Sequence, residues 1–337
     1  MGDTVTLCLS ELEELIVKAL VRSSVSADNA RSVAKALTLA EADGQAGHGL
    51  SRVPSYAAQA RSGKVDGTAV VRTKQPRTAS LIVDAGHGFA YPALDAAIRQ
   101  LPQLAGECGV AAAGITRSHH FGVAAHPCER LAETGLLAIA FGNTPSAMSA
   151  WGGKRPLFGT NPIAFAAPCR DRPPIVIDLA LSEVARGKIF AAARKGQPIP
   201  EGWALDAAGN PTTDADAALR GTLLPAGGAK GAALALMVEL LAAALTGANF
   251  AYEASSFFEA EGAPPGVGQL LLAIDPEGFA GRDAFADRAA LLAAVIEQDG
   301  GARVPGTRRR ALREQAHRCG VTVEARLYAE VEAIASG

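Results

Sequence analysis

The sequence predicts an α/β protein in which helices cover the faces of a mixed β-sheet. Three observations support this fold class. The middle of the 337-residue chain contains short apolar runs bounded by glycine, proline, asparagine or aspartate. Segments with helical hydrophobic spacing lie between several of these runs. The glycine fingerprint of an ordinary Rossmann domain, Gly-x-Gly-x-x-Gly between a strand and a helix, is missing, as is Gly-x-x-x-x-Gly-Lys-Ser/Thr.

The first third of the chain is predicted to be mainly helical. Ser10 is a suitable N-cap for its first helix, Ser26 for its second, and Gly63 ends its third. The expected helices here span residues 11–21, 29–42, 51–62 and about 93–107, with one strand at 80–84.

The rest of the chain alternates between strands and helices. Strands are expected at residues 110–116, 136–141, 162–166, 174–179 and 269–274, and a surface loop at 209–216. Helices are expected at residues 230–245, 283–298 and 308–336, with a glycine- and proline-rich connection at 262–268.

Composition excludes several functional classes. With 49% hydrophobic residues, 20% charged residues and a formal net charge of -2, the chain lacks the positive field that binds nucleic acid or an acidic membrane surface. Its five cysteines are scattered without a Cys-x-x-Cys pair, so no disulfide framework or thiolate zinc site is expected. Residues 1–10 lack a basic stretch followed by an apolar run, and Glu239 interrupts the apolar segment 231–245. We therefore expect a cytoplasmic protein that does not enter membranes.

His48 and Arg52 form the first candidate catalytic pair. They are four residues apart, so both side chains reach one face if a helix begins there. An imidazole can exchange a proton with the atom at C2 of a 2-oxo or 2-imino carboxylate, while a guanidinium holds the carboxylate. The alternative is a loop histidine beside a solvated arginine.

Ser118-His119-His120-Phe121 follows an expected strand, at a place where α/β proteins commonly bind ligands. His119, His120 and His126 lack the glutamate of a His-Glu-x-x-His zinc motif, so hydrogen bonding or acid–base chemistry is favoured and no metal is expected. Hydrolase chemistry is disfavoured because no Gly-x-Ser-x-Gly motif occurs.

Two further segments have both a structural and a ligand-binding interpretation. Gly227-Gly228-Ala229-Lys230-Gly231 precedes a helix and is either a loop or a site for an anionic group. Asp178 ends an apolar strand and is either a helix cap or an acceptor for a ribose hydroxyl. Gly159 to Pro162 reads first as a turn.

Together these blocks make nearly the whole chain resemble the malate/L-lactate dehydrogenase-like family, which includes malate, sulfolactate and ureidoglycolate dehydrogenases and the Δ1-piperideine-2-carboxylate/Δ1-pyrroline-2-carboxylate reductases. Such an ordered series is more specific than any single block. The matching blocks are Asp43-Gly44, His48-Gly49 with Arg52, Gly63-Lys64-Val65, Ser118 to Phe121, Leu157 to Pro162, Asp178 with Ala185-Arg186-Gly187, Gly227-Gly228 with Lys230-Gly231, Met237-Val238-Glu239 and Pro305-Gly306.

The resemblance implies a non-Rossmann NAD(P)-binding fold with a largely antiparallel sheet flanked by helices, an N-terminal helical segment and a homodimer whose site lies near the subunit interface. It implies that His48 donates a proton and Arg52 clamps a carboxylate, with His120 as a second candidate donor. The implied cofactor positions are Thr160 and Asn161, both near the reacting centre, and Asp178, Leu179, Ala180, Gly228, Ala229, Lys230, Pro305 and Gly306.

The chain departs from the family at Gly47, where serine is usual, and at Ala229, where histidine is common. The run from Ser118 to Phe121 and the expected helix after Lys230 look closest to the cyclic imino acid reductases. We therefore expect an NAD(P)H-dependent reductase of a small 2-imino carboxylate, with NADPH slightly preferred over NADH. The alternatives are a dehydrogenase of 2-oxo or 2-hydroxy acids such as sulfolactate, malate or lactate, and a binding protein that has lost catalysis.

The length suggests about two domains, with a site in the cleft between them. We expect residues 1–80 and 300–337 to form a helical part, 81–120 and 230–299 a substrate-binding and dimerisation part, and 121–229 an NAD(P)-binding part.

Overall fold

The computed structural model describes residues 3–337, and Met1 and Gly2, which open the segment searched for a targeting signal, lie outside the described residues. The helices are α1 (Leu9–Val21), α2 (Ala27–Ala42), α3 (Val53–Ser62), α4 (Ala90–Cys108), α5 (Ala125–Ala132), α6 (Arg186–Arg194), α7 (Ala215–Arg220), α8 (Ala229–Val238), the π-helical η3 (Glu239–Ala244), α9 (Arg282–Gln298), α10 (Thr307–Cys319) and α11 (Ala325–Ser336). Short 3₁₀ turns are η1 (Ala46–His48), η2 (Leu50–Arg52) and η4 (Pro276–Gly278).

The main sheet has seven strands in the order β2-β3-β4-β13-β5-β8-β9. Every neighbouring pair is antiparallel except β3 with β4, which confirms a mixed sheet that is largely antiparallel. Its strands are β2 (Arg72–Arg77), β3 (Ser80–Asp84), β4 (Val110–Ser118), β5 (Leu137–Gly142), β8 (Ile163–Cys169), β9 (Arg172–Leu179) and β13 (Val267–Ile274).

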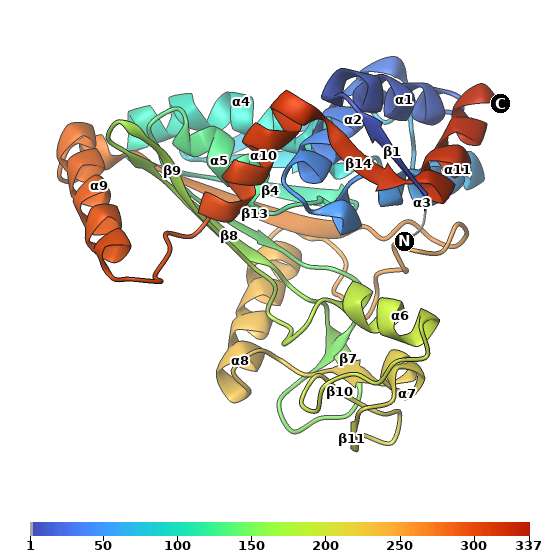
Figure 1. Ribbon diagram of the computed structural model, residues 1–337. Coiled ribbons are helices and arrows are strands. Elements are labelled where there is room, and N and C mark those ends of the chain that lie inside the picture. The colour runs from blue at the N-terminus through green and yellow to red at the C-terminus, as the bar shows by residue number, and fades with distance from the viewer. Residues whose placement is uncertain (1–2) are drawn as a thin grey trace.

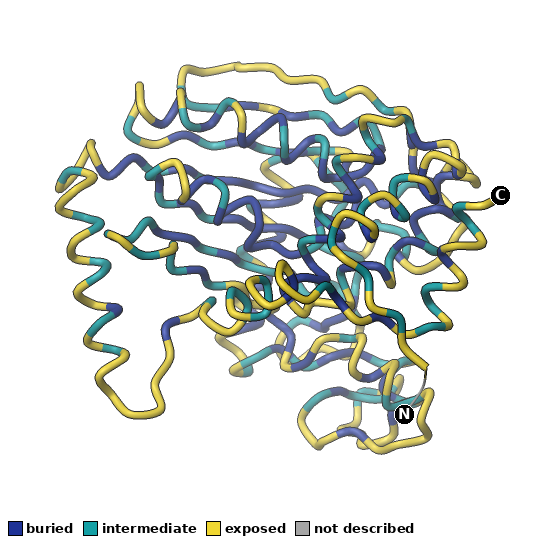
Figure 2. Tube along the Cα trace, turned by 45° about the horizontal axis from the view of Figure 1, so that its top comes forward, coloured by how far each residue is buried: buried dark blue, intermediate teal, exposed yellow. Residues whose placement is uncertain are grey.

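Helices cover both faces of this sheet, as the apolar runs predict (Figure 1). Helices α4 and α5 contact each other and pack on one face, against β4, β5 and β8. The π-helical η3 packs on the other face, against β13 and β5. The central strand β13 is therefore almost wholly buried, and Figure 2 shows the buried trace concentrated in this layer.

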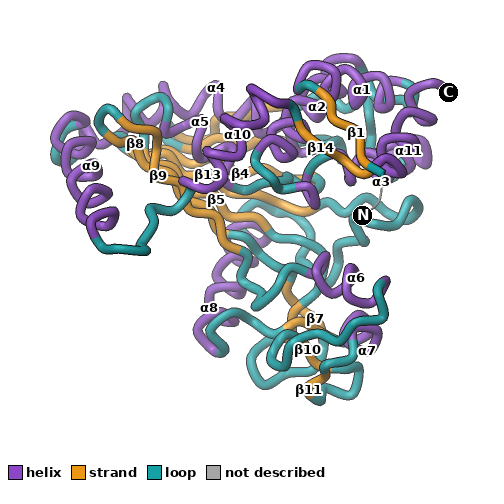
Figure 3. The backbone as a smooth tube through the Cα atoms, in the orientation of Figure 1, coloured by secondary structure: helices purple, strands orange, loops and turns teal. Residues whose placement is uncertain are grey.

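A second sheet of five short strands lies below the main sheet in Figure 3. Its order is β11-β10-β12-β6-β7, and its hydrophobic residues form a second core with α6, α7 and α8. The strands are β6 (Met148–Ser149), β7 (Pro156–Phe158), β10 (Ala204–Leu205), β11 (Pro211–Thr212) and β12 (Thr222–Leu223).

The two ends of the chain meet in a short antiparallel pair of strands. Strand β1 (Thr4–Leu7) pairs with β14 (Val321–Glu324), so that Leu7 lies opposite Val321. Helix α11 then packs on α1 and α3, beside the N-terminal helices (Figure 1).

Three predicted segments differ from the structure for identifiable reasons. The expected helix 308–336 is broken at Gly320, whose φ of 77° ends α10 before β14. The expected helix 230–245 changes to π-helical geometry at Glu239, whose buried carboxylate is bound by loop residues described below. The expected loop 209–216 contains β11 and the start of α7. Strand β2 escaped prediction because all its residues are exposed, which leaves no apolar alternation.

A buried ionic cluster attaches α10 to the rest of the molecule. The fully buried carboxylate of Asp43 accepts hydrogen bonds from Arg313 at 2.6 Å and 2.9 Å and pairs with His126 at 2.9 Å. Arg313 also binds Glu129 of α5, at 2.8 Å. Burial alone would raise the pKa of Asp43, but the hydrogen bonds from His126 and Arg313 outweigh it and lower that pKa.

We predict that Arg313→Met lowers the free energy of unfolding by about 3–5 kcal/mol, because it leaves Asp43 and Glu129 buried without their main cation. Urea unfolding measures this change. Arg318→Met, on the exposed side of the same helix, is the matched control and should stay within about 0.5 kcal/mol of the parent protein. Equal losses in both variants would contradict this role for the cluster.

Candidate active site

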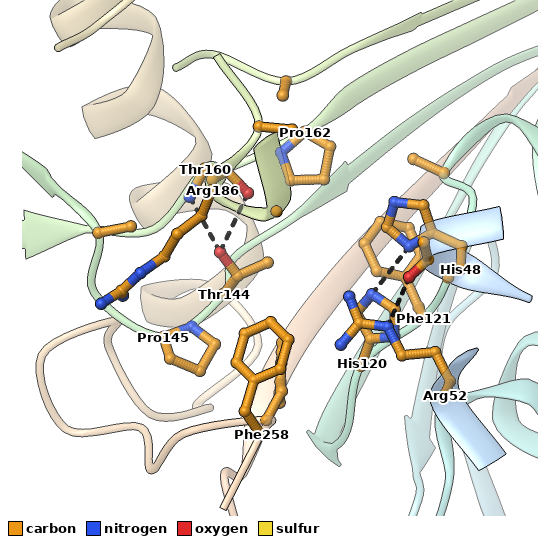
Figure 4. A pocket seen from close by; sticks show the side chains of 18 of the residues that line it. His48, Arg52, His120, Phe121, Thr144, Pro145, Thr160, Pro162, Arg186 and Phe258 are labelled. Carbon is orange, nitrogen blue, oxygen red and sulfur yellow. Dashed lines mark hydrogen bonds between the residues drawn. The ribbon is translucent and has the colours of Figure 1, made fainter. Parts of the chain in front are cut away.

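A cavity of about 650 Å³ lies where the main sheet continues into the smaller sheet. Segments that link the two sheets form one wall, with Thr144, Thr160 and Ala180. The η1–η2 turns and the end of β4 form the opposite wall, and a loop rich in aromatic residues closes the third side. Figure 4 shows His48, Arg52 and His120 to one side of this cavity and Thr144, Thr160 and Arg186 to the other.

The turn that carries His48 is held by a buried carboxylate. Glu41 accepts a hydrogen bond from the backbone N–H of Leu50 at 2.7 Å. A Cβ on Gly49 would lie 2.4 Å from the same carboxylate, so only glycine allows this approach. His48 and Arg52 thus lie in two successive 3₁₀ turns, rather than on one helical face, yet both line the cavity.

His48 and His120 form a stacked, hydrogen-bonded pair. Their ring centroids are 5.1 Å apart, and Nδ1 of His48 lies 3.2 Å from Nε2 of His120. The remaining nitrogen of His120, Nδ1, lies 2.6 Å from the hydroxyl of Tyr56. Both nitrogens of His120 are therefore occupied, while the Nε2 atom of the half-buried His48 has no partner among residues 3–337.

The electrostatics of the pair favour neutral imidazoles. Burial is the larger cause and the Arg52 guanidinium the next, and together they lower the pKa of His48 to about 4. The same two causes hold the pKa of His120 well below its usual value and lower that of the neighbouring His119 to about 3. Each ring therefore carries one proton near neutral pH.

Arg52 has a free donor in the cavity wall. Its Nε atom donates to the carbonyl oxygen of Gly47 at 2.7 Å, and its guanidinium lies 4.8 Å from the centre of the Phe258 ring. Its Nη1 atom is enclosed and has no hydrogen-bond partner in the described part of the chain. Because an unpaired buried donor is costly, this atom is suited to an incoming carboxylate.

The opposite wall is fastened by a buried glutamate. The N–H of Thr160 donates to Oγ1 of Thr144 at 2.9 Å, and a Cβ on Gly159 would collide with that atom. Asn161, in left-handed conformation at φ 39°, donates from Nδ2 to Glu239 Oε1 at 3.0 Å. Thr160 therefore faces the cavity, whereas Asn161 is fully buried and acts on the turn from behind.

The cavity also contains features suited to the phosphates of a nucleotide. Arg186 and Gly187, the first residues of α6, line it, as does Ala124, the residue before α5, so two helix N-termini lie at its wall. Arg186 lines it as well and has no carboxylate partner within residues 3–337. Burial lowers the pKa of Arg186, and an anionic ligand would offset that cost. These residues fit NAD(P), which supplies or accepts a hydride when bound.

Some of the other expected cofactor residues line this cavity and others do not. Asp178 lines the cavity, and its side chain is 27% exposed. It accepts a hydrogen bond from the N–H of Ala125 at 3.2 Å and therefore caps α5. Burial raises the pKa of Asp178. Ala180 also lines the cavity, but Leu179 does not.

Two expected cofactor segments lie outside the main cavity. Gly228 and Ala229 begin α8, and Lys230 is exposed there. Pro305 and Gly306 border a second, smaller cavity of about 100 Å³ beside Arg309 and Arg310. No cluster of potential metal ligands occurs within residues 3–337.

Sequence reasoning missed the aromatic loop, defined here as residues 254–262, which contributes Phe257 and Phe258 to the cavity. The buried Lys64 holds this loop by donating from Nζ to the carbonyl oxygens of Ser256, Glu259 and Glu261 at 2.7, 3.0 and 3.1 Å. Burial lowers the pKa of Lys64. The block Gly63-Lys64-Val65 matched the family but did not predict this contact, because the partner of Lys64 lies about 190 residues away in sequence.

We predict that acidification destabilises the protein partly through His48. In an unfolded chain the imidazole takes up a proton near pH 6.5, but folded His48 does so only near pH 4. Stability from this group is therefore complete above pH 6.5 and is lost as the pH falls toward 4. Urea unfolding of the parent protein and His48→Gln between about pH 7 and pH 5 should show a shallower loss in the variant.

The matched control is His317→Gln, which removes an exposed histidine from α10. It should keep the pH dependence of the parent protein. If His48→Gln also keeps the parental slope, the neutral state of folded His48 is contradicted.

The geometry thus brings a guanidinium with an unpaired donor and a pair of neutral histidines together beside one cavity. A family model described as malate/L-lactate dehydrogenase matches residues 8–332. The chain belongs to the malate/L-lactate dehydrogenase family, and the protein is an NAD(P)-dependent oxidoreductase, as its sequence predicted.

Individual relatives span nearly the whole chain. The protein is 56% identical over 308 residues to a (2R)-3-sulfolactate dehydrogenase (NADP(+)) of Chromohalobacter salexigens, covering 91% of each chain. It is 44% identical over 319 residues to a Δ1-pyrroline-2-carboxylate/Δ1-piperideine-2-carboxylate reductase of Pseudomonas putida, covering 93% of this chain and 92% of the relative.

Solved structures agree with this assignment. The Δ1-piperideine-2-carboxylate reductase of Pseudomonas syringae pv. tomato superimposes with a TM-score of 0.92 at 39% identity, over 98% of this chain and 99% of the other. The sulfolactate dehydrogenase of Methanocaldococcus jannaschii superimposes with a TM-score of 0.90 at 29% identity, over 98% and 97% of the two chains.

Proposed function

We propose that the protein transfers a hydride between NADP(H) and C2 of a small carboxylate, with Arg52 holding the carboxylate and His48 exchanging a proton at the C2 oxygen or nitrogen. The observation that carries this proposal is that two residues lining one cavity wall keep unused groups: Arg52 its enclosed Nη1 and His48 its free Nε2. A cation and a single acid–base atom are what a 2-oxo or 2-imino carboxylate requires.

Of the two candidate proton donors, the hydrogen bonds favour His48. His120 is bound at both ring nitrogens, by His48 and by Tyr56. Both rings line the cavity, but His48 uses only Nδ1 within the described residues and keeps Nε2 free. His120 then supports His48 and does not itself meet the substrate.

For the substrate, a 2-oxo/2-hydroxy acid of the 3-sulfolactate type has the stronger support from similarity. The sulfolactate dehydrogenase of Chromohalobacter salexigens is 56% identical, against 44% for the imine reductase of Pseudomonas putida. The cyclic imine remains a second candidate, supported by those reductases and by the aromatic walls at Phe257 and Phe258. Gly47 has open space around its missing Cβ, so the departure from serine leaves room beside His48.

NADPH oxidation with 3-sulfopyruvate, Δ1-pyrroline-2-carboxylate and Δ1-piperideine-2-carboxylate separates the two substrate classes, and NADH in parallel tests the preference for NADP. A higher kcat/KM for sulfopyruvate supports the 2-oxo acid, and a higher value for either imine supports the reductase that the sequence favoured. Tight NADPH binding without turnover on these and other 2-oxo acids would contradict catalysis and favour a binding protein.

We predict that His48→Gln lowers kcat by about 10²- to 10⁴-fold, because it removes the acid–base group. The Kd of NADPH, measured by fluorescence titration, should change little. His120→Gln is the comparison variant and should lose less activity, because it removes only a supporting hydrogen bond. A larger loss in His120→Gln than in His48→Gln would reverse the assignment.

We also propose a non-Rossmann mode of cofactor binding. A Rossmann domain needs a mostly parallel sheet, whereas the main sheet has one parallel pair. We assign cofactor binding to residues 121–229, substrate binding and dimerisation to 81–120 and 230–299, and a supporting helical part to 1–80 and 300–337. Within this division Thr160, Asp178 and Ala180 face the cavity, while Asn161, Leu179, Gly228, Ala229, Lys230, Pro305 and Gly306 remain proposed contacts.

We propose a homodimer that covers the exposed leucines of α8 and η3. Leu234, Leu236 and Leu240 are 42%, 48% and 53% exposed, and α8 projects away from the main sheet in Figure 1. Exposed leucines of this kind are typical of a protein interface. They also lie on the segment whose cofactor contacts are absent from the main cavity, which suits a site near the subunit interface.

We predict that the parent protein has twice the chain mass of 34.4 kDa in light scattering and that Leu236→Lys combined with Leu240→Lys yields monomer, because two charges would be buried at the interface. Val70→Lys, at a residue 79% exposed on a different surface, is the control and should stay dimeric. A double variant that keeps the dimer mass would exclude this surface.

The cytoplasm remains our proposed location. It is supported by the five cysteines, all of which are free. No helix among residues 3–337 is long and apolar enough to span a membrane.

A further inference from the structure

Four side chains form one hydrogen-bonded chain from the protein core to the cavity. The hydroxyl of Tyr91 lies 3.2 Å from that of Tyr56, and Tyr56 lies 2.6 Å from Nδ1 of His120. His120 Nε2 then meets His48 Nδ1 at 3.2 Å. Tyr56 is fully buried and Tyr91 is 6% exposed, so neither hydroxyl belongs to the surface of the cavity.

We propose that Tyr56 and Tyr91 are positioning residues that fix the direction of this chain, so that His48 presents a protonated Nε2 to the C2 oxygen or nitrogen of the substrate. The inference rests on the proposed function of His48 and adds the residues that set its tautomer.

The direction follows from the supply of donors. Each tyrosine has one O–H donor, and the hydroxyl of Tyr91 has no partner other than Tyr56 within the described chain. If Tyr56 donated to Tyr91, the proton of Tyr91 would be buried without an acceptor, which is costly. Tyr91 therefore donates to Tyr56, and Tyr56 donates to His120 Nδ1.

The same reasoning carries through the two imidazoles. An Nδ1 atom that accepts a hydrogen bond leaves the single proton of neutral His120 on Nε2, which donates to His48 Nδ1. The proton of His48 is then on Nε2, the nitrogen without a protein partner among residues 3–337. The cation of Arg52 disfavours a second proton on either ring, so the opposite tautomers are the only competing arrangement.

The surroundings hold the chain in this geometry. A Cβ on Gly122 would lie 2.7 Å from the hydroxyl oxygen of Tyr91, so glycine at this position leaves the space the hydroxyl occupies. Edge contacts from Tyr56 to His119 and a tilted contact from His120 to Phe257 keep the rings in place. A neutral imidazole held in one tautomer can polarise a carbonyl or imine without first acquiring a charge.

The direct test is NMR of the ligand-free parent protein with ¹⁵N-labelled histidine, assigned with His48→Gln and His120→Gln. We expect both rings to be neutral Nε2–H tautomers near neutral pH. A proton on Nδ1 of either His48 or His120 would overturn the inference. Because this measurement needs no substrate, it stays readable even if every tested acid fails to turn over, so it separates this inference from the proposed function.

Variants test the consequence for catalysis. Tyr56→Phe should convert His120 to a mixture of tautomers and lower kcat by about 10- to 100-fold, with little change in KM. Tyr91→Phe should act in the same direction but less strongly. Tyr328→Phe removes a hydroxyl from the surface of α11 and is the matched control. A folded Tyr56→Phe variant with parental tautomers and parental kcat would contradict the role assigned to Tyr56.

Discussion

The hydrogen bond between His48 and His120 connects a turn of the N-terminal helical region to the segment that follows the central strand β4. Two features bring the rings together. The carboxylate of Glu41 accepts a hydrogen bond from the N–H of Leu50 and so holds the turn, and β4 ends where His120 can reach His48. Burial and Arg52 keep both rings uncharged, so the pair is held by one shared proton rather than by opposite charges. The orientation of both imidazoles in this wall of the cavity depends on that contact.

The other wall depends on a buried carboxylate of a different kind. Glu239 begins the π-helical turn beneath the main sheet and binds Asn161 and, at the limit of hydrogen-bond length, Asn143. Burial raises the pKa of Glu239, and the hydrogen bonds from the asparagines oppose that shift. These hydrogen bonds offset the cost of enclosing the carboxylate, and they hold the turn that sets Thr160 against Thr144. A π-helical segment at a functional site is a recurring use of such local irregularity.

Much of the fold and part of the site could be predicted from the chain. Apolar periodicity identified the principal helices and the buried strands, since their burial imposes a regular pattern on the sequence. The pattern failed where burial did not impose it, as in the exposed β2 and the very short strands of the second sheet. His48, Arg52 and His120 were identifiable from local motifs, and the structure places all three on the same cavity. Phe257, Phe258 and Tyr56 carried no such signal, because aromatic residues at these spacings are typical of any core.

The sequence by itself determined the family and the class of chemistry and supplied candidate residues for it, because short motifs preserve the chemical groups a reaction needs. Only the tertiary structure decided which nitrogen of which histidine is free and that Arg52 retains an unused donor. It also showed that Lys64 fastens the aromatic loop and that the glycine cluster before α8 lies away from the main cavity. The physical reason is that hydrogen-bond direction and enclosure arise from segments far apart in the chain, such as Tyr56 with His120, and no local pattern encodes such a meeting.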